Sequence, residues 1–215
     1  MNINLYADTI AITGIIGSGK STISDLLEKR GAYVIRADVL SAAVLCDDYE
    51  NYREVKQKIC ILLKRHGKSD IIPQIFPEKG LNRKALGEAI FQNSQMTKEL
   101  GEIIHPEVKK LFETKVSRLY NGKKIIIYDV PLLFETGLNK IMKKNIVVYA
   151  PENIAIQRAA LRLGISEEEV KKRLNHQISI EKKMGMADYV INNSGNLDQL
   201  HTEVDKLWKY LQDIK

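Results

Sequence analysis

The stretch Gly14-Ile15-Ile16-Gly17-Ser18-Gly19-Lys20-Ser21, followed by Thr22, decides the fold of this 215-residue chain. It fits the phosphate-binding-loop pattern G-x-x-x-x-G-K-[ST]. The apolar, β-prone residues 9–13 before it predict a buried strand. Residues 21–29 after it predict a helix, because their apolar side chains recur at helical spacing. A glycine-rich turn with a chance match is the alternative, and the strand and helix on either side argue against it.

The chemistry of a phosphate loop needs these residue types at this spacing. Glycines let the backbone curl so that successive N–H groups point at an anion, and the helix N-terminus adds unpaired donors and a positive dipole end. We expect Lys20 to bridge the β- and γ-phosphates of a nucleotide and the Ser21 hydroxyl to hold Mg²⁺. The predicted ATP-binding residues of this segment are Gly14, Gly17, Ser18, Gly19, Lys20, Ser21 and Thr22.

The composition limits the classes of ligand that the chain is expected to bind. Hydrophobic residues make up 44% and charged residues 28% of the chain, which is ordinary for a globular protein. The net charge of +6 suits nucleic acid, a ligand with several phosphates, or a merely basic surface. The phosphate loop favours the second. The basic residues are spread over several elements without a cluster of stacking aromatics, so we expect no nucleic-acid partner.

The chain carries no sequence signal for export or membrane insertion. Cys46 and Cys60 form no C-x-x-C pair, which indicates reduced cysteines of a cytosolic protein. The first residues lack a basic segment followed by an apolar core, and no apolar run approaches the roughly 18 residues of a membrane span. We therefore expect a cytoplasmic location and no membrane partner.

Two predicted strands end near an aspartate. Asp38 follows the strand at residues 32–36, and Asp129 ends the strand at residues 123–129. Open α/β folds place ligands at the carboxyl ends of parallel strands. Asp38 is therefore a candidate base for an attacking hydroxyl, or a group that positions Mg²⁺; the alternative is an N-cap of the next helix. Asp129 has the form of a Walker B aspartate that holds Mg²⁺, although buried strands also end in Asp without a metal.

The region between these strands is rich in helical patterns. We predict helices over residues 52–65, 83–91, 95–104 and 107–119. Residues 71–80 read as a loop, His105-Pro106 as a break, and Asn121-Gly122 as a turn. A P-loop kinase would place its acceptor-substrate domain here; the alternative is a set of packing helices without a ligand.

Two basic helices follow the strand predicted at residues 145–149. Pro151 opens the first and Gly164 closes it, and residues 166–169 form a capping box for the second. Arg158 and Arg162 are four residues apart and share a helix face. An arginine of a kinase lid stabilises charge in the transition state, and the alternative is a solvated basic face, which we favour for Lys171 and Lys172.

The C-terminal part completes an α/β pattern. Residues 188–191 predict the last strand and residues 192–195 a turn. Three-four spacing then marks a helix with the apolar stripe Leu197, Leu200, Val204, Leu207 and Leu211.

The chain therefore predicts a P-loop NTPase-type α/β fold, a three-layer α/β/α arrangement around a parallel sheet. Residues 1–38 and 121–215 form the nucleotide-binding core, with a helical lid at about 152–184. Residues 39–120 form a helical acceptor-substrate domain inserted in that core.

The motifs together resemble the dephospho-CoA kinases, the P-loop kinases of coenzyme A biosynthesis, over almost the whole chain. The segments that carry the resemblance are residues 13–21, Ala37-Asp38, residues 83–91, His105-Pro106, Pro131-Leu132-Leu133-Phe134-Glu135, Arg158 with Arg162, Arg173 with Gln177, and residues 187–195. The phosphate loop is shared by a vast superfamily, whereas residues 131–135 and 187–195 in this order are far more specific.

The resemblance implies ATP-dependent phosphorylation of the ribose 3′-hydroxyl of dephospho-CoA, with Mg²⁺ as cofactor. It implies that Asp38, Lys20 and Arg158 are catalytic, that Arg162 supports Arg158 in binding ATP, and that Asp38, Arg83 and His105 belong to the acceptor site. Ser21 and Asp129 are the metal candidates. The oligomeric state stays open.

Three positions depart from the family pattern. Ile15 replaces a usual glycine, Ala42 a usual arginine, and Leu163 a usual acid; the stretch between Asp38 and Arg83 is also longer than expected. If the arginine missing at Ala42 contacts a substrate, Arg36 or an inserted residue must compensate. Two other hypotheses are a related P-loop kinase for another nucleoside or small metabolite, and a nucleotide-binding regulator without phosphoryl transfer.

Overall fold

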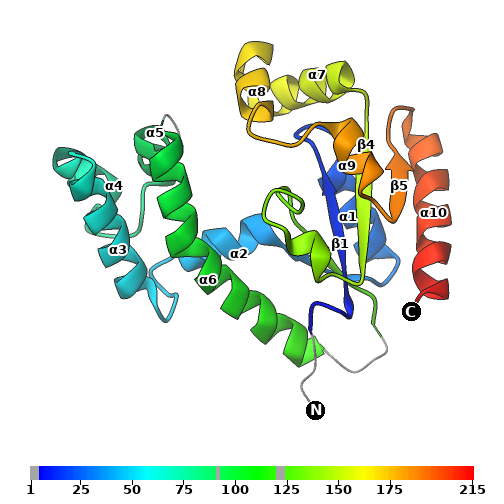
Figure 1. Ribbon diagram of the computed structural model, residues 1–215, viewed down its shortest axis with the longest axis horizontal. Helices are drawn as coiled ribbons and strands as arrows, with labels where there is room; N and C mark the ends of the chain where they lie inside the picture. Colours follow the sequence, from blue (N-terminus) through cyan, green and yellow to red (C-terminus); the bar gives the residue numbers. More distant parts are fainter. Residues whose placement is uncertain (1–4, 91–92, 120–123) are drawn as a thin grey trace. The chain divides into compact units, whose positions relative to one another are not determined.

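The computed structural model describes residues 5–90, 93–119 and 124–215 (Figure 1). The strands are β1 (Thr9–Gly14), β2 (Tyr33–Arg36), β3 (Ile126–Asp129), β4 (Lys144–Tyr149) and β5 (Tyr189–Asn192). The α-helices are α1 (Lys20–Lys29), α2 (Ala37–Val44), α3 (Tyr52–Arg65), α4 (Ile72–Ile75), α5 (Arg83–Ile90), α6 (Ser94–Leu119), α7 (Glu152–Leu163), α8 (Glu167–Leu174), α9 (Ile180–Gly185) and α10 (Leu197–Asp213). The short 3₁₀ helices are η1 (Ser69–Ile71) and η2 (Leu138–Lys140).

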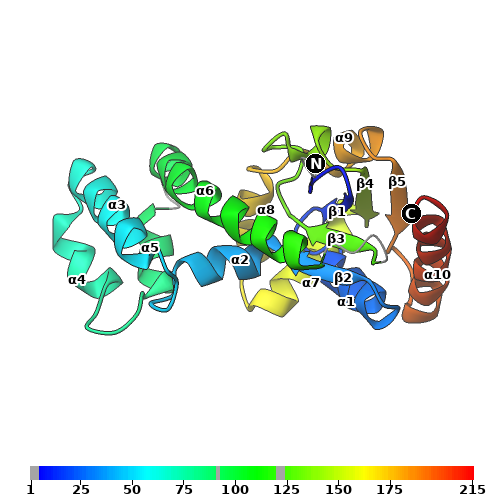
Figure 2. The ribbon, with the colours of Figure 1, turned by 90° about the horizontal axis from the view of Figure 1, so that it is seen from below.

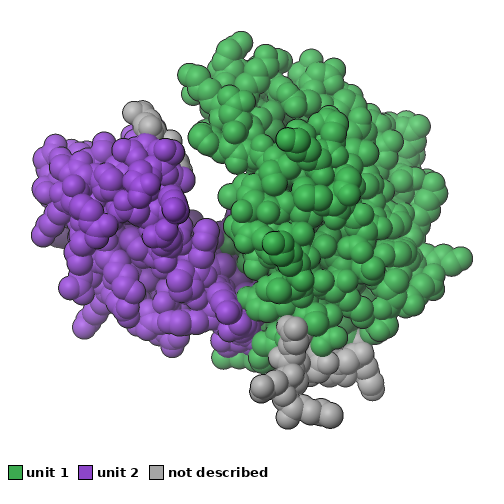
Figure 3. Space-filling model, viewed as in Figure 1, with its two compact units in different colours: residues 1–37, 116–215 green, residues 38–115 purple. Residues whose placement is uncertain are grey.

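The chain folds into two compact units, which Figure 3 shows in different colours. The first unit joins Met1–Ala37 to Val116–Lys215, and the second is Asp38–Lys115. The first unit contains all five strands, and the second is helical. That the helical unit binds the acceptor substrate stays a prediction.

The first unit is built on a fully parallel sheet with the strand order β2-β3-β1-β4-β5. The central strand β1 is buried at every residue, as expected for a parallel strand that is covered on both faces. In register, Ile12 lies opposite both Asp129 on β3 and Ile146 on β4. The carboxyl ends of β1 and β3 therefore lie side by side, and the phosphate loop follows the first of them.

Helices cover both faces of this sheet. Figure 2 shows α1 and α10 on one face and α9 on the other, which confirms the predicted three-layer α/β/α fold. The core under α1 and α10 consists of Ile10, Ile12, Ile23, Leu27, Ala32, Val34, Ile125, Ile127, Ile146, Val148, Ile191, Leu200, Val204, Leu207 and Leu211. Full burial of one such aliphatic side chain contributes about 1.5–3 kcal/mol, so the side chains on this face together contribute strongly to the stability of the unit.

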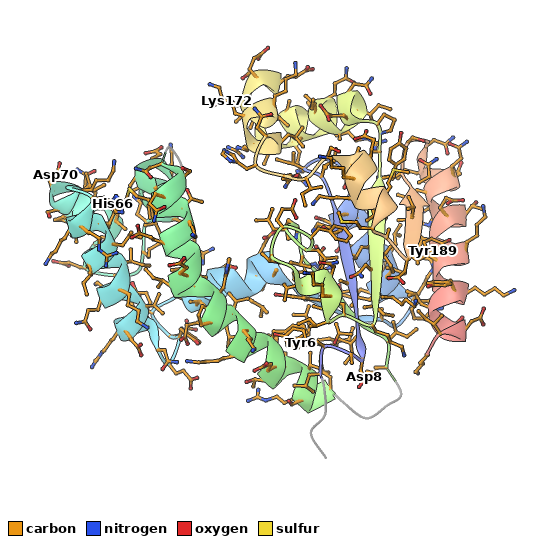
Figure 4. All side chains as sticks on the ribbon, in the orientation of Figure 1. Tyr6, Asp8, His66, Asp70, Lys172 and Tyr189 are labelled. Carbon is orange, nitrogen blue, oxygen red and sulfur yellow. The ribbon has the colours of Figure 1, made fainter. Side chains whose placement is uncertain are left out.

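The C-terminal helix covers the edge strand β5. Figure 4 shows Tyr189 of β5 beside α10, where its ring lies 4.9 Å from that of Tyr210. The predicted apolar stripe of α10 is wrong at one end, because Leu197 is 68% exposed. Leu197 is the first residue of the helix, at the carboxyl edge of the sheet, where no strand remains for it to cover.

Two predictions in the helical regions are wrong, and one short helix was missed. His105-Pro106 does not break a helix, because α6 runs without interruption from Ser94 to Leu119. The predicted loop at residues 71–80 contains α4, whose Pro73 lies in the first turn, where its missing N–H is not needed. The short helix α9 was not predicted. The turn at Asn121-Gly122, Lys123 and Phe91 lie outside the described residues.

The continuity of α6 follows from its apolar stripe. The buried residues Met96, Leu100, Ile104, Val108, Phe112 and Val116 recur every fourth position on both sides of Pro106. A proline inside a helix costs about 3 kcal/mol, which is less than the burial of several of these side chains contributes. Pro106 is also exposed, as is Glu102, the residue whose carbonyl a proline at 106 deprives of its helical donor.

The second unit contains a buried carboxylate that accepts hydrogen bonds from three side chains. Glu107 of α6 is 6% exposed and accepts hydrogen bonds from Tyr49 Oη (2.7 Å), Asn51 Nδ2 (2.9 Å) and Lys110 Nζ (2.8 Å). Burial would raise the pKa of Glu107, but the hydrogen bonds from Lys110, Tyr49 and Asn51 outweigh it and lower the pKa from 4.5 to about 2. The ionised form of Glu107 therefore joins α6 to the segment that precedes α3.

This network predicts an acid-sensitive stability. Because the pKa of Glu107 is lower in the folded state, its contribution is present above pH 4.5 and is lost as the pH falls towards 2. Glu107→Gln should lower the free energy of unfolding at pH 7 by about 1–3 kcal/mol. It should also make that free energy fall less steeply between pH 4.5 and pH 2. Urea unfolding followed by circular dichroism measures both. The exposed Glu102→Gln on the same helix is the control, and equal acid profiles of the two variants would contradict the assignment.

Candidate active site

The phosphate loop packs closely against its neighbours, and two of its glycines also have a positive φ that disfavours a side chain. Gly17 and Gly19 have φ values of 80° and 89°. A Cβ atom on Gly17 would lie 1.9 Å from the carbonyl oxygen of Ala155 in α7, and one on Gly19 would lie 2.0 Å from Asn193 Nδ2. The loop is therefore held between the start of α7 and the residue that follows β5.

Hydrogen bonds fix the backbone of the loop. Ser18 N donates to Ile15 O (3.1 Å), and Ser18 O accepts from Asn193 Nδ2 (2.8 Å). Ile16 N donates to Gln177 Oε1 at 3.1 Å. By contrast, no acceptor in the described part of the chain takes the backbone N–H groups of residues 17 and 19–22. This preformed curl offers a set of free donors to an anion at the N-terminus of α1.

A buried carboxylate lies beside the loop lysine. Asp129, at the end of β3, is 3% exposed; its Oδ1 forms an ion pair with Lys20 Nζ, and its Oδ2 accepts from Ser24 Oγ at 2.8 Å. Lys20 is the first residue of α1 and Ser24 lies one turn later. The structure thus brings together Lys20 and Asp129, which are 109 residues apart, and adds Ser24, which the sequence analysis missed.

The two arginines of α7 line a cavity beside the loop. Arg158 is half-buried and donates from Nη1 to Asn193 O at 2.7 Å, whereas Arg162 is exposed. The cavity has a volume of about 750 Å³. Its lining residues are Gly17, Gly19, Thr22, Arg158, Arg162, Asn193, Gly195, Asn196, Leu197, Asp198 and Leu200. A site with free backbone donors at one end and two guanidinium groups in its wall suits a ligand with several phosphates.

Asn193 is a site residue that the sequence analysis read only as part of a turn. It is 7% exposed. Its amide side chain bonds the loop, its carbonyl accepts from Arg158, and its own N–H donates to Tyr149 O at 2.7 Å. An asparagine directly after a buried strand was the only local signal, since its partners lie far away in the sequence.

The predicted acceptor residues Asp38, Arg83 and His105 lie in the second unit. Asp38 is exposed and is the second residue of α2, so the N-cap alternative is wrong. Arg83 donates from Nη2 to Ala42 O at 2.7 Å and approaches Cys46 Sγ at 3.5 Å. His105 is exposed, and its ring lies against Gly101 one turn earlier in α6. A role for these three residues in binding a substrate stays a prediction.

The departures from the family pattern have separate structural settings. Ile15 is 3% exposed and has a negative φ, so its position does not require glycine. Leu163, the last residue of α7, is 39% exposed. Arg36 forms ion pairs with Asp25 (2.5 Å) and Glu28 (3.0 Å) on α1 and is therefore already engaged. Arg83, in contrast, lies directly at Ala42.

The oxygen atoms at the loop could hold Mg²⁺ only together with a bound ligand that supplies further oxygens. The Ser21 hydroxyl and the Asp129 carboxylate are hard donors of the type that Mg²⁺ takes. The described residues contain no group of three or more His, Cys, Asp or Glu that could hold a metal alone. Mg²⁺ is commonly held by one or two protein oxygens together with substrate phosphates, and this donor set fits that pattern. No helix in the described part of the chain is long and apolar enough to cross a membrane.

Comparison with known proteins identifies the family. The family model for dephospho-CoA kinase matches residues 8–199. The dephospho-CoA kinase of Geobacillus kaustophilus is 34% identical over 95% of this chain and 98% of its own, and that of Aquifex aeolicus is 36% identical over 94% and 96%. The solved dephospho-CoA kinase of Campylobacter jejuni superposes with a TM-score of 0.66 at 27% identity, over 96% of this chain and 98% of that one. The chain therefore belongs to the dephospho-CoA kinase family.

Proposed function

We propose that this chain transfers the γ-phosphoryl group of ATP to the ribose 3′-hydroxyl of dephospho-CoA, which yields CoA and ADP. Family membership supports the reaction. The observation that carries the nucleotide half is the preformed loop with its free N–H groups, since Gly17, Gly19 and Thr22 line the same cavity as the two arginines of α7. Phosphoryl transfer needs positioning and charge stabilisation more than covalent chemistry, and this site supplies both.

The nucleotide takes its place along the cavity. Its phosphates accept from the backbone of residues 17 and 19–22, and Arg158 and Arg162 line the wall beside them. The exposed side chain of Leu197 offers an apolar surface for the base at the other end of the lining. Asn193 O orients Arg158 through one nitrogen and leaves its remaining guanidinium donors for the phosphates, whose charge grows in the transition state.

Lys20 changes partner when ATP binds. In the structure its ammonium group is paired with Asp129. A triphosphate at the loop carries more negative charge than one carboxylate and attracts this ammonium towards the β- and γ-phosphates. Ser21 and Asp129 are the residues that would hold Mg²⁺ bound with ATP, which would supply charge neutralisation at the phosphates. Lys20 then stabilises the oxygen that leaves on ADP.

Asp38 supplies the base for the acceptor. Arg36 lies opposite Asp129 in the register of β2 and β3, and Asp38 follows two residues later with an exposed carboxylate. An aspartate there accepts the proton of the attacking hydroxyl, or its hydrogen bond, as the group approaches the γ-phosphorus. Arg83 and His105 complete the acceptor side of the proposal.

The reaction is tested by ADP release from the purified protein with Mg²⁺ and ATP. We expect release that depends on dephospho-CoA and is absent with adenosine, AMP or no acceptor. Release only with another acceptor would point to a P-loop kinase of different specificity. A protein that binds ATP but releases no ADP with any acceptor would instead be a nucleotide-binding regulator.

Lys20→Ala should lower kcat by about 10²–10³-fold or more, because it removes the charge that stabilises the leaving oxygen. Steady-state kinetics at saturating dephospho-CoA measures the loss. The matched control is Lys29→Ala, an exposed lysine at the other end of α1. A variant at Lys20 with the wild-type kcat would remove this residue from the mechanism.

Asp38→Asn should lower kcat by about 10²–10⁴-fold, since the amide cannot accept a proton, and should leave the affinity for ATP unchanged. Turnover and calorimetric ATP binding are measured on the same preparation. Asp48→Asn changes an exposed aspartate of the same unit and should be silent. Full activity of Asp38→Asn would show that Asp38 is only a first-turn residue of α2.

A further inference from the structure

A set of partly buried polar contacts beside the phosphate loop has no part in the proposed reaction. The segment after α8 reaches the loop through Gln177, whose Oε1 accepts from Ile16 N at 3.1 Å. The next residue, Ile178, donates from its backbone N–H to Glu135 Oε1 at 2.8 Å. Glu135 belongs to the segment that follows β3, so two stretches distant in sequence meet at the loop.

A fully buried lysine closes this set of contacts. Lys183 of α9 is 0% exposed, and its Nζ lies 2.8 Å from Glu135 Oε1 and 3.2 Å from Pro131 O. Pro131 O also accepts from Thr13 Oγ1 at 3.0 Å. Thr13 immediately precedes Gly14, the first residue of the loop. The contacts thus reach Ile16 within the loop and Thr13 directly before it.

The polar character of this cluster is costly for stability alone. Removing a lysine and a carboxylate from water has a large desolvation penalty, and well-packed apolar residues often stabilise such a site as well or better. The second carboxylate oxygen of Glu135 is buried without a hydrogen-bond partner in the described part of the chain. An apolar pair could neither accept from Ile178 N nor donate to Pro131 O, so it would not fix the orientation of these backbone groups.

We propose that Gln177, Glu135 and Lys183 form a brace that fixes the first half of the phosphate loop in its ATP-binding conformation. They are positioning residues. Glu135 and Lys183 hold residues 177 and 178 in place, and Gln177 then holds Ile16 so that the following N–H groups converge on the phosphates. The inference rests on the proposed use of the loop for ATP, but not on the identity of the acceptor.

The test measures ATP binding by calorimetry with Mg²⁺ and no acceptor, together with the thermal unfolding temperature. Gln177→Met keeps the length of the side chain and removes the acceptor for Ile16 N. Loss of one hydrogen bond at the loop should raise the Kd for ATP by up to about tenfold, with an unchanged unfolding temperature and an unchanged KM for dephospho-CoA. Gln157→Met, an exposed glutamine on α7, is the matched control and should bind ATP as the wild type does.

The double variant Glu135→Leu/Lys183→Met separates positioning from stability. It removes both buried charges together, so neither is left without a partner. We expect a retained unfolding temperature and a Kd for ATP that is raised as in Gln177→Met. The brace is overturned if Gln177→Met binds ATP with the wild-type affinity. It is also overturned if the double variant loses ATP affinity only to the extent that its unfolding temperature falls.

The same measurements distinguish failure of the brace from failure of the proposed function. A wild-type protein that binds ATP but does not turn over dephospho-CoA overturns the proposed reaction and leaves the brace to be judged by the Kd values alone. A wild-type protein that binds no ATP overturns both.

Discussion

The ion pair between Lys20 and Asp129 is the interaction on which the nucleotide site depends. It joins the first residue of α1 to the last residue of β3, and Ser24 holds the second carboxylate oxygen from one turn further along the same helix. A carboxylate that is 3% exposed requires such partners, because an unpaired charge in that position would be strongly destabilising. The contacts of Asp129 with Lys20 and Ser24 therefore both hold α1 against the sheet and keep a charged pair next to the phosphate loop.

The parallel register places this pair. Because Ile12 lies opposite Asp129, β1 and β3 end at the same edge, and the chain must turn there between a buried strand and a helix that buries one face. The loop makes that turn with two glycines of positive φ. Its backbone then has donors that neither the strand nor the helix can satisfy, and an anion is their natural partner. The affinity for phosphate thus follows from the way in which the fold connects β1 to α1.

Local patterns predicted the parts of this arrangement that are contiguous in sequence. The strand, loop and helix around Lys20 were predictable because burial and helical spacing are visible within about twenty residues. The caps of α7 and α8 were predictable for the same reason: Gly164 takes a positive φ, and Ser166 with Glu169 forms a capping box.

The remaining parts depend on contacts between distant segments. Asn193 meets Ser18 across 175 residues, Gln177 meets Ile16 across 161, and Ser24 meets Asp129 across 105. No local pattern marks such partners. Pro106 shows the opposite case, in which a strong local signal for a helix end was overruled by the buried stripe of α6 on both sides of it. The exposure of Leu197 likewise depends on where the sheet ends, which helical spacing does not reveal.

The close approach of Gly19 and Asn193 leaves the two positions unequally tolerant of substitution. A Cβ atom at residue 19 would lie 2.0 Å from the amide nitrogen that bonds Ser18 O, and the φ of 89° would strain a larger residue there even beside a smaller one at 193. That smaller residue would give up the side-chain bond to the loop. Residue 193 can therefore change while Gly19 stays, at the cost of that bond, whereas residue 19 requires glycine whatever residue stands at 193.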